Sequence, residues 1–217
     1  MPYDLIIFDL DGTLADSFAF FVSVHNRLAD RHGFRRIAPT EVDALRDRSA
    51  REVMRHVGLS RWKLPWVARS FVRMMRAADI PLFAGIEPTL EHLQRSGAAL
   101  ALVSSNAADN CRRILGDAHW QRLVHVECGA SIFGKGRRIA RVLRATGADP
   151  DRTIYIGDQI TDADAAGAAG VAFGAVAWGY ATRASLERLQ PTHLFDAVED
   201  LALLTAWRYQ PHHVATA

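Results

Sequence analysis

The chain has 217 residues, a formal net charge of +2, and a composition of 49% hydrophobic and 23% charged residues. These values are ordinary for a globular protein with a hydrophobic core, and the length predicts one domain or one domain with a sizeable insertion. No nucleic-acid-binding module and no basic tail is visible, which argues against a nucleic-acid partner.

The sequence also argues against a membrane protein. The longest uncharged stretch, 165–182, is interrupted by four glycines, whereas a spanning helix needs about 20 predominantly apolar residues. The N-terminus has no basic region of the kind that opens a signal peptide. Cys111 and Cys128 have neither the spacing of a metal site nor a disulfide framework. We therefore expect a cytoplasmic protein.

The first predicted element is a buried strand over residues 5–8, an uninterrupted apolar run. Asp9 and Asp11 follow it directly. Burying two neighbouring carboxylates costs free energy, because their charges repel and both lose water. A hard divalent cation such as Mg²⁺ would offset that cost, and a carboxylate can also be a nucleophile. We interpret Asp9 as a candidate nucleophile and metal ligand, and Asp11 as a nearby acid and base.

Two other interpretations compete for this segment. An Asp-Gly pair after a strand is a common turn. An Asp-x-Asp start also occurs in EF-hand calcium loops, which need Gly at the sixth position and Glu at the twelfth. This chain has Leu14 and Phe20 at those positions, so the calcium loop is ruled out. The choice between a turn and a catalytic site then depends on residues further along the chain.

Apolar spacing and helix start and stop residues predict an all-helical insertion over residues 16–81. The expected helices cover 15–30, a stretch that begins at 39, 53–57 behind a capping box of Ser49 and Glu52, and 62–78. This insertion has 13 arginines and lysines against seven acidic residues, whereas the remainder has 13 against 17. A basic insertion that faces an acidic body favours an anionic ligand between them, although arginine-rich helices can also simply face solvent.

The rest of the chain alternates between predicted strands and helices, which indicates a parallel sheet covered on both faces. The expected strands are 98–103, 123–127, 153–156, 171–177 and 193–195, and the expected helices are 87–96, 107–115, 136–146, 161–169 and 197–207. We predict an α/β fold with a Rossmann-like parallel core formed by 1–15 and 82–217, and a helical cap domain formed by 16–81.

Polar residues follow the predicted strands where ligands of such sheets bind, beyond the carboxyl ends. They are Asp9 and Asp11, then Ser104, Ser105 and Asn106, then Asp158 and Asp162. Small hydroxyl groups and free backbone N–H groups before a helix suit a phosphate. Asp158 adds an oxygen ligand for Mg²⁺. Thr161 and Asp164 have the spacing of a capping box, so Asp164 needs no further role, whereas Asp162 lies nearest Asp158 and is expected to support it.

Lys135 is one of only two lysines, against 24 arginines. It lies between Gly134 and Gly136 at an expected helix start, where a compact ammonium could bind a phosphate oxygen or a buried carboxylate. An exposed loop lysine is the alternative.

In this order, the residues resemble the four motifs of the haloacid dehalogenase superfamily, and more narrowly its phosphoglycolate-phosphatase-like phosphatases with a small helical (C1-type) cap. Residues 9–17 resemble the first motif, Ser104 the second, Lys135 the third, and Asp158 with Asp162 the fourth. The resemblance spans residues 3 to about 204.

This resemblance implies Mg²⁺-dependent hydrolysis of a small phosphate monoester through an aspartyl-phosphate. Asp9 would attack phosphorus, and Asp11 would protonate the leaving oxygen and then activate water. Mg²⁺ would be held by Asp9, the carbonyl of Asp11, and Asp158. The phosphoryl group would be held by Ser104, the backbone of Ser105, and Lys135.

Two departures from the family pattern concern the substrate. Gly136 stands where phosphoglycolate enzymes often have proline, and Asp47 stands where related caps often have glycine. Arg46, Arg48 and Arg51 cluster around Asp47 and form a candidate second anion site. Together with the basic insertion, they favour a small, doubly anionic substrate such as a phosphorylated short acid.

Three alternative functions share some of these features. A phosphomutase would use the same four motifs. A P-loop nucleotide-binding protein is suggested by residues 129–135, but Gly136 replaces the Ser or Thr of a Walker A loop, and Asp9 and Asp11 would have no role. A non-catalytic binding protein is disfavoured because no motif is broken. The oligomeric state is left open.

Overall fold

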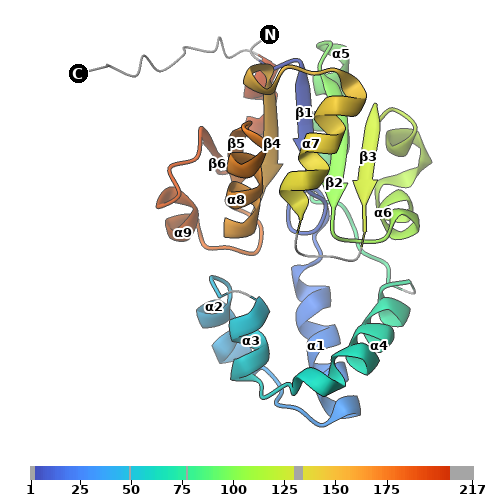
Figure 1. The fold of residues 1–217 in the computed structure, drawn as a ribbon, viewed down its shortest axis with the longest axis vertical. Coiled ribbons are helices and arrows are strands. Elements are labelled where there is room, and N and C mark those ends of the chain that lie inside the picture. The colour runs from blue at the N-terminus through green and yellow to red at the C-terminus, as the bar shows by residue number, and fades with distance from the viewer. Residues whose placement is uncertain (1–2, 49, 77, 130–133, 206–217) are drawn as a thin grey trace.

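The computed structural model describes residues 3–48, 50–76, 78–129 and 134–205, and within these ranges six parallel strands form one sheet (Figure 1). The strand order is β3-β2-β1-β4-β5-β6. The strands are β1 (Leu5–Phe8), β2 (Ala99–Ser104), β3 (His125–Cys128), β4 (Thr153–Gly157), β5 (Ala172–Val176) and β6 (His193–Phe195). The chain runs outward from β1 in both directions, and ligands of open α/β sheets bind at such a reversal.

Helices cover both faces of the sheet, because alternate residues of the strands point to opposite faces. Ile6 and Phe8 pack with α5 and α6, whereas Leu5 and Ile7 pack with α7 and α8. The helices of this part are α5 (Ile86–Arg95), α6 (Ala108–Trp120), α7 (Lys135–Thr146), α8 (Ile160–Ala169), α9 (Arg183–Glu187) and the 3₁₀ helix Val198–Thr205. This arrangement confirms the predicted α/β fold with a parallel sheet.

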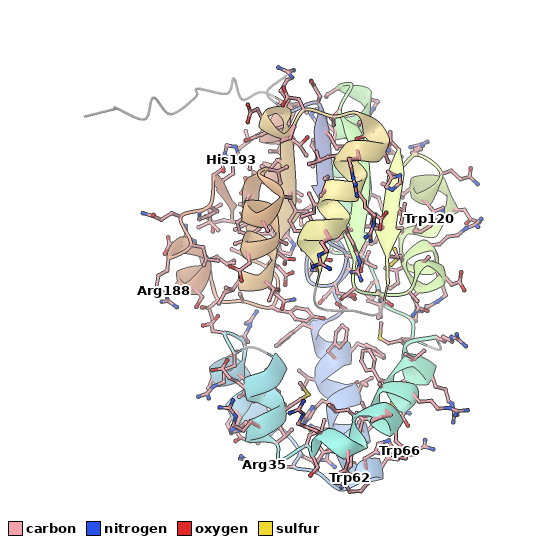
Figure 2. The ribbon with its side chains drawn as sticks, viewed as in Figure 1. Arg35, Trp62, Trp66, Trp120, Arg188 and His193 are labelled. Carbon is pink, nitrogen blue, oxygen red and sulfur yellow. The ribbon has the colours of Figure 1, made fainter. Side chains whose placement is uncertain are left out.

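The basic insertion lies beyond the carboxyl ends of the strands (Figure 1). Its helices are α1 (Phe18–His32), α2 (Val42–Leu45), α3 (Ala50–His56) and α4 (Leu64–Arg76), with 3₁₀ turns at Pro39–Glu41 and Arg61–Lys63. Val24, Leu28 and Val67 form a small core between α1 and α4. Trp62 and Trp66 are exposed at the end of the insertion farthest from the sheet (Figure 2). The division into a core of 1–15 and 82–217 and a cap of 16–81 stays a prediction.

Three details differ from the sequence-based predictions. Helix α8 begins at Ile160, so its capping box pairs Gln159 with Asp162, and the predicted pairing of Thr161 with Asp164 is wrong. The short helix α9 was not predicted, and the last predicted helix, 197–207, is described as the shorter 3₁₀ helix Val198–Thr205. The capping box at Ser49 lies outside the described residues. No helix in the described ranges is long and apolar enough to cross a membrane.

Candidate active site

Three buried carboxylates meet beyond the carboxyl ends of β1 and β4, which are neighbours in the sheet. They belong to Asp9, Asp158 and Asp162, and their ligand oxygens lie within 4.8 Å of one another. Asp9 follows β1, where its backbone N–H donates to the carbonyl of Ile156 in β4 at 2.9 Å. Each of the three residues is at most 2% exposed. The sheet therefore brings together acids that are up to 153 residues apart in sequence.

Lys135 lies between two of these carboxylates at the first residue of α7. Its Nζ donates to Oδ2 of Asp9 at 2.6 Å and to Oδ1 of Asp162 at 2.7 Å. Burial alone would lower the pKa of Lys135, but the charges of Asp162 and Asp9 outweigh burial and raise it above its usual value. Lys135 is 7% exposed, so the alternative of an exposed loop lysine is wrong. It stays an ammonium and fixes Asp9.

Asp162 uses both of its oxygens within the protein. Oδ1 also accepts from the hydroxyl of Tyr155 at 3.1 Å, and Oδ2 accepts from the backbone N–H groups of Asp158 and Gln159 at 3.2 and 3.0 Å. With Lys135, these donors occupy the carboxylate. Asp162 is therefore better suited to orient Lys135 and the start of α8 than to face a ligand.

Asp158 is held by the loops on either side of it. Its Oδ1 accepts from the hydroxyl of Thr13 at 3.2 Å, and its Oδ2 accepts from the backbone N–H of Tyr180 at 2.7 Å. A Cβ atom on Gly12 would lie 2.2 Å from Oδ2 of Asp158, and one on Gly179 would lie 2.2 Å from its Cβ. Only glycine fits at these two positions, because the backbone packs directly on the carboxylate.

Asp11 lies beside these groups and has an unsatisfied oxygen. Its Oδ2 accepts from Nδ2 of Asn106 at 3.3 Å, whereas its buried Oδ1 has no hydrogen-bond partner among the described residues. Burial raises the pKa of Asp11, while the nearby Ser17 hydroxyl and the hydrogen bond from Asn106 oppose that rise.

Among the described residues, the site carries more negative charge than the ammonium of Lys135 can neutralise. Burial raises the pKa of Asp9 to about 7, although Lys135 acts to lower it. Burial also raises the pKa of Asp158, and the charge of Asp162 adds to this rise. A divalent cation with oxygen ligands would relieve this repulsion between the buried carboxylates. The residues present therefore fit a Mg²⁺ ion; which of them bind it stays a prediction.

Ser104 ends β2 and is fully buried. Its Oγ accepts from the backbone N–H of Asn106 at 3.0 Å, and its carbonyl accepts from Nη1 of Arg138 at 3.2 Å. Nη2 of Arg138 donates to the carbonyl of Gly129 at 3.0 Å. Ser105 is partly exposed between Ser104 and Asn106. The assignment of Ser104 and Ser105 to phosphate binding stays a prediction.

Arg46 and Arg48, both predicted to bind substrate, differ in their surroundings. Nε and Nη2 of Arg46 donate to the carbonyls of Tyr180 and Gly179 at 2.9 and 2.6 Å. Its neighbour Asp47 accepts from the backbone N–H and the hydroxyl of Thr182 at 2.9 and 2.8 Å. Arg48 is exposed, and its Nε lies 3.4 Å from the carbonyl of Ala44. Arg46 and Asp47 therefore fasten the insertion to the loop after β5.

Sequence reasoning placed Asn106 among the polar residues at the strand ends but gave it no individual role, and it gave no role to Arg138 or Tyr180, although all three contact the site. Tyr180 also shares a hydrogen bond with Ser17 at 2.8 Å, and its ring contacts that of Phe18. One signal was available for Arg138: it lies three residues after Lys135, on the same face of a helix. The contacts of Tyr180 have no local sequence signal.

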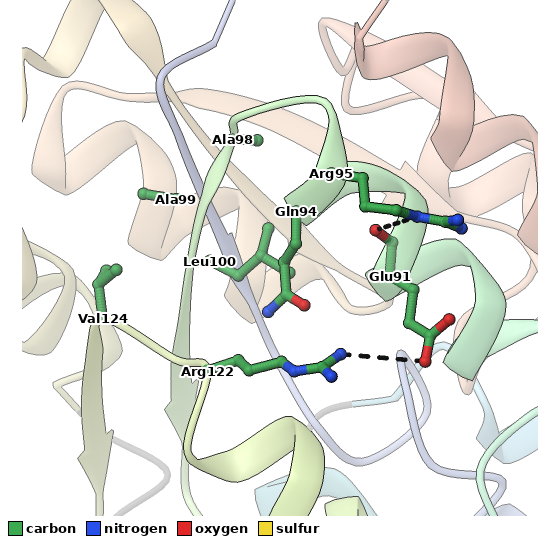
Figure 3. A pocket seen from close by; sticks show the side chains of 8 residues that line it. All are labelled: Glu91, Gln94, Arg95, Ala98, Ala99, Leu100, Arg122 and Val124. Atoms are coloured by element: carbon green, nitrogen blue, oxygen red, sulfur yellow. Dashed lines mark hydrogen bonds and ion pairs between the residues drawn. The ribbon is translucent and has the colours of Figure 1, made fainter.

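A surface pocket of about 590 Å³ lies beside α5 and β2 (Figure 3). It is lined by residues from α5, by Ala99 at the first position of β2, and by Arg122, whose Nη1 lies 3.9 Å from Oε1 of Glu91. Ser104 ends the same strand, so the pocket is at the opposite end of the sheet from the carboxylates. It contributes nothing to that cluster.

Comparison with known proteins finds a matching family, relatives in sequence, and solved structures with the same fold. Residues 6–176 match the model of the haloacid dehalogenase-like hydrolases. The chain is 32% identical over 202 residues to a phosphoglycolate phosphatase of Synechococcus elongatus, covering 90% of this chain and 94% of that protein. It is 31% identical over 205 residues to a tyrosine-protein kinase of Mycobacterium tuberculosis, covering 87% and 67%. A candidate phosphoglycolate phosphatase from Lactobacillus plantarum has the same fold, with a TM-score of 0.82, 22% identity, and coverage of 94% and 100%.

Proposed function

The chain belongs to the haloacid dehalogenase-like hydrolases, and we propose that it is a Mg²⁺-dependent phosphatase that forms an aspartyl-phosphate on Asp9. The observation that carries this proposal is the pairing of Asp9 with Lys135 at 2.6 Å, beside Asp11 and Asp158 at the strand-order reversal. A buried carboxylate that is fixed by an ammonium is preorganised to act as a nucleophile.

The proposed reaction has two steps. In the first, a carboxylate oxygen of Asp9 forms a bond to phosphorus, the ester P–O bond breaks, and Asp11 gives its proton to the leaving oxygen. In the second, Asp11 takes a proton from water, the water oxygen bonds to phosphorus, and the bond to Asp9 breaks to release inorganic phosphate. Ser104, Ser105 and Lys135 hold the phosphoryl oxygens throughout. When bound by Asp9, the carbonyl of Asp11, and Asp158, Mg²⁺ would neutralise charge on the phosphoryl group.

The proposed substrate is a small phosphorylated acid. The relative from Synechococcus elongatus is a phosphoglycolate phosphatase, which supports this substrate class. The excess of basic residues in the insertion also supports it, because a second anionic group on the substrate would be attracted to that charge. The proposed enzyme has a catalytic core of residues 1–15 and 82–217 and a cap of residues 16–81, and it is cytoplasmic.

Removal of the metal tests the proposed function directly. We expect the purified protein to release inorganic phosphate from members of a panel of phosphorylated short acids when Mg²⁺ is present. An excess of EDTA should lower the rate about tenfold or more, and added Mg²⁺ should restore it, because the buried carboxylates need a counter-charge to accept a dianionic phosphoryl group. Phosphate release at an unchanged rate in EDTA would contradict the metal dependence. The absence of release from every ester would contradict the proposed phosphatase activity.

Two other phosphoryl transfers need to be measured beside hydrolysis. A phosphomutase would use the same residues, so sugar-phosphate isomerisation should be assayed against phosphate release. The 31% identity to a tyrosine-protein kinase favours transfer from ATP to protein as the second candidate. Incorporation of the γ-phosphate of ATP into tyrosine without phosphate release would support that candidate instead.

The two cap arginines provide a test of the substrate class. We propose that Arg48 binds the second anionic group, whereas Arg46 serves mainly to hold the insertion against Gly179 and Tyr180. Arg48→Ala should then lower kcat/KM about tenfold or more for an acidic phosphate but not for a neutral alkyl phosphate, because a charge-assisted hydrogen bond of ~1.5–3 kcal/mol is lost. Arg46→Ala should lower both values by a similar factor. If neither variant distinguishes the substrates, the phosphorylated-acid proposal is to be dropped.

A further inference from the structure

Asn106 connects two candidate catalytic groups through its hydrogen bonds. Its backbone N–H donates to Oγ of Ser104 at 3.0 Å, and its side-chain Nδ2 donates to Oδ2 of Asp11 at 3.3 Å. Its carbonyl accepts from the N–H of Gly129 at 3.0 Å, which ties it to the end of β3. One residue thus contacts both the group expected to bind phosphate and the group expected to move the proton.

The orientation of the Asn106 amide is fixed by its surroundings. Oδ1 accepts from the backbone N–H of Ala107 at 2.9 Å and from Nδ2 of Asn110 at 3.0 Å. Asn110 lies in the first turn of α6 and is 4% exposed. If the amide were turned over, its NH₂ group would face the backbone N–H of Ala107, which cannot accept. The amide nitrogen must therefore point to Asp11.

We infer that Asn106 is a positioning residue that aims the Asp11 carboxyl group at the leaving oxygen of the substrate. This inference rests on the proposed function, because it concerns the proton that Asp11 would give. The amide hydrogen bond fixes Oδ2 of Asp11 and leaves Oδ1, the oxygen without a partner among the described residues, to carry the proton. Asn110 acts indirectly, because its Nδ2 donates to Oδ1 of Asn106 and holds that amide in place.

A leaving-group comparison separates this role from a general effect on folding. An alkoxide leaving group must be protonated as the ester bond breaks, whereas p-nitrophenolate leaves without a proton. Asn106→Ala should therefore lower kcat/KM for an alkyl phosphate such as phosphoglycolate about tenfold or more relative to kcat/KM for p-nitrophenyl phosphate. The ratio of kcat/KM values is the readout, because it reports only the first phosphoryl transfer.

Asn26 on α1 provides a matched control. Its amide is also hydrogen-bonded at both ends, to the carbonyl and the N–H of Ile37 at 3.0 and 2.8 Å, but it lies in the insertion. Asn26→Ala should leave the substrate ratio at the wild-type value. If Asn106→Ala does not fold, Asn110→Ala tests the same role through the same ratio of kcat/KM values. That ratio should fall about threefold or more, because the Asn106 amide oxygen loses one of the two donors that hold it.

The possible results are distinct. A selective loss on the alkyl phosphate supports the positioning role. Equal losses on both substrates, or no loss, overturn it while the proposed function stands. If the wild-type protein hydrolyses neither ester with Mg²⁺, the proposed function fails, and the inference fails with it.

Discussion

Asp9→Asn is expected to lower the rate of phosphate release on the order of 10⁴-fold or more, because the amide cannot form the bond to phosphorus. The variant should still fold. The pairing of Lys135 with Asp162 remains, and one of the mutually repelling buried charges is removed. The measurement is phosphate release with Mg²⁺, accompanied by intact mass after an acid quench, which should show a phosphorylated wild-type protein and an unmodified variant.

Asp4→Asn is the matched control for that substitution. Asp4 lies at the other end of β1, where its exposed carboxylate pairs with Arg152. The same chemical change there should leave phosphate release within about twofold of the wild-type rate, because surface ion pairs contribute little. Full activity of Asp9→Asn would remove Asp9 from the role of nucleophile, whatever the control shows.

The sheet and its carboxylates could be predicted from sequence because their signals are local. An apolar run such as 5–8 is compatible with a buried strand, and residues after parallel strands meet at one edge of the sheet. This reasoning alone placed Asp9 and Asp158 near each other, and the structure has their oxygens within 4.8 Å. The alternation of strands and helices likewise determines the layered architecture before any contact is known.

The contacts between the insertion and the sheet could not be predicted in the same way. Arg46 has the sequence context of an anion-binding residue, yet two of its nitrogens donate to the carbonyls of Gly179 and Tyr180. Backbone carbonyls are present at every residue, so the sequence contains no signal for which of them an arginine will meet. The partner of Asp47, Thr182, lies 135 residues away and is found only once the two segments are docked.

The error at the start of α8 has a similar origin. Two pairs with capping-box spacing overlap there, and the sequence favours Thr161 with Asp164 because threonine is a better N-cap than glutamine. In the structure Asp162 is buried and accepts from the N–H groups of Asp158 and Gln159, which moves the helix start to Ile160. Asp162 is also the buried partner of Lys135. This long-range ion pair outweighs the local preference for threonine at the N-cap.

Lys135→Arg should lower kcat/KM about 10²-fold or more, although it keeps the positive charge. The Nζ of Lys135 lies 2.6 and 2.7 Å from two buried carboxylates, and one of them, Asp162, also accepts from the hydroxyl of Tyr155. A planar guanidinium is larger than an ammonium and cannot take the same position without displacing Asp9. The rate should fall although both carboxylates still have a cationic partner, because Asp9 is no longer held in position.

Two further variants make that result interpretable. Lys135→Met leaves the carboxylates of Asp9 and Asp162 buried without a counter-charge, so it should lower the free energy of unfolding by about 3–5 kcal/mol in addition to abolishing activity. Lys63→Arg changes the other lysine of the chain, whose Nζ donates to the carbonyls of His32 and Gly33, and should leave the rate unchanged. Wild-type rates in Lys135→Arg would show that the charge alone is required at this position. The compact ammonium would then have no part in aligning Asp9, and the scarcity of lysine in an arginine-rich chain would carry no functional meaning.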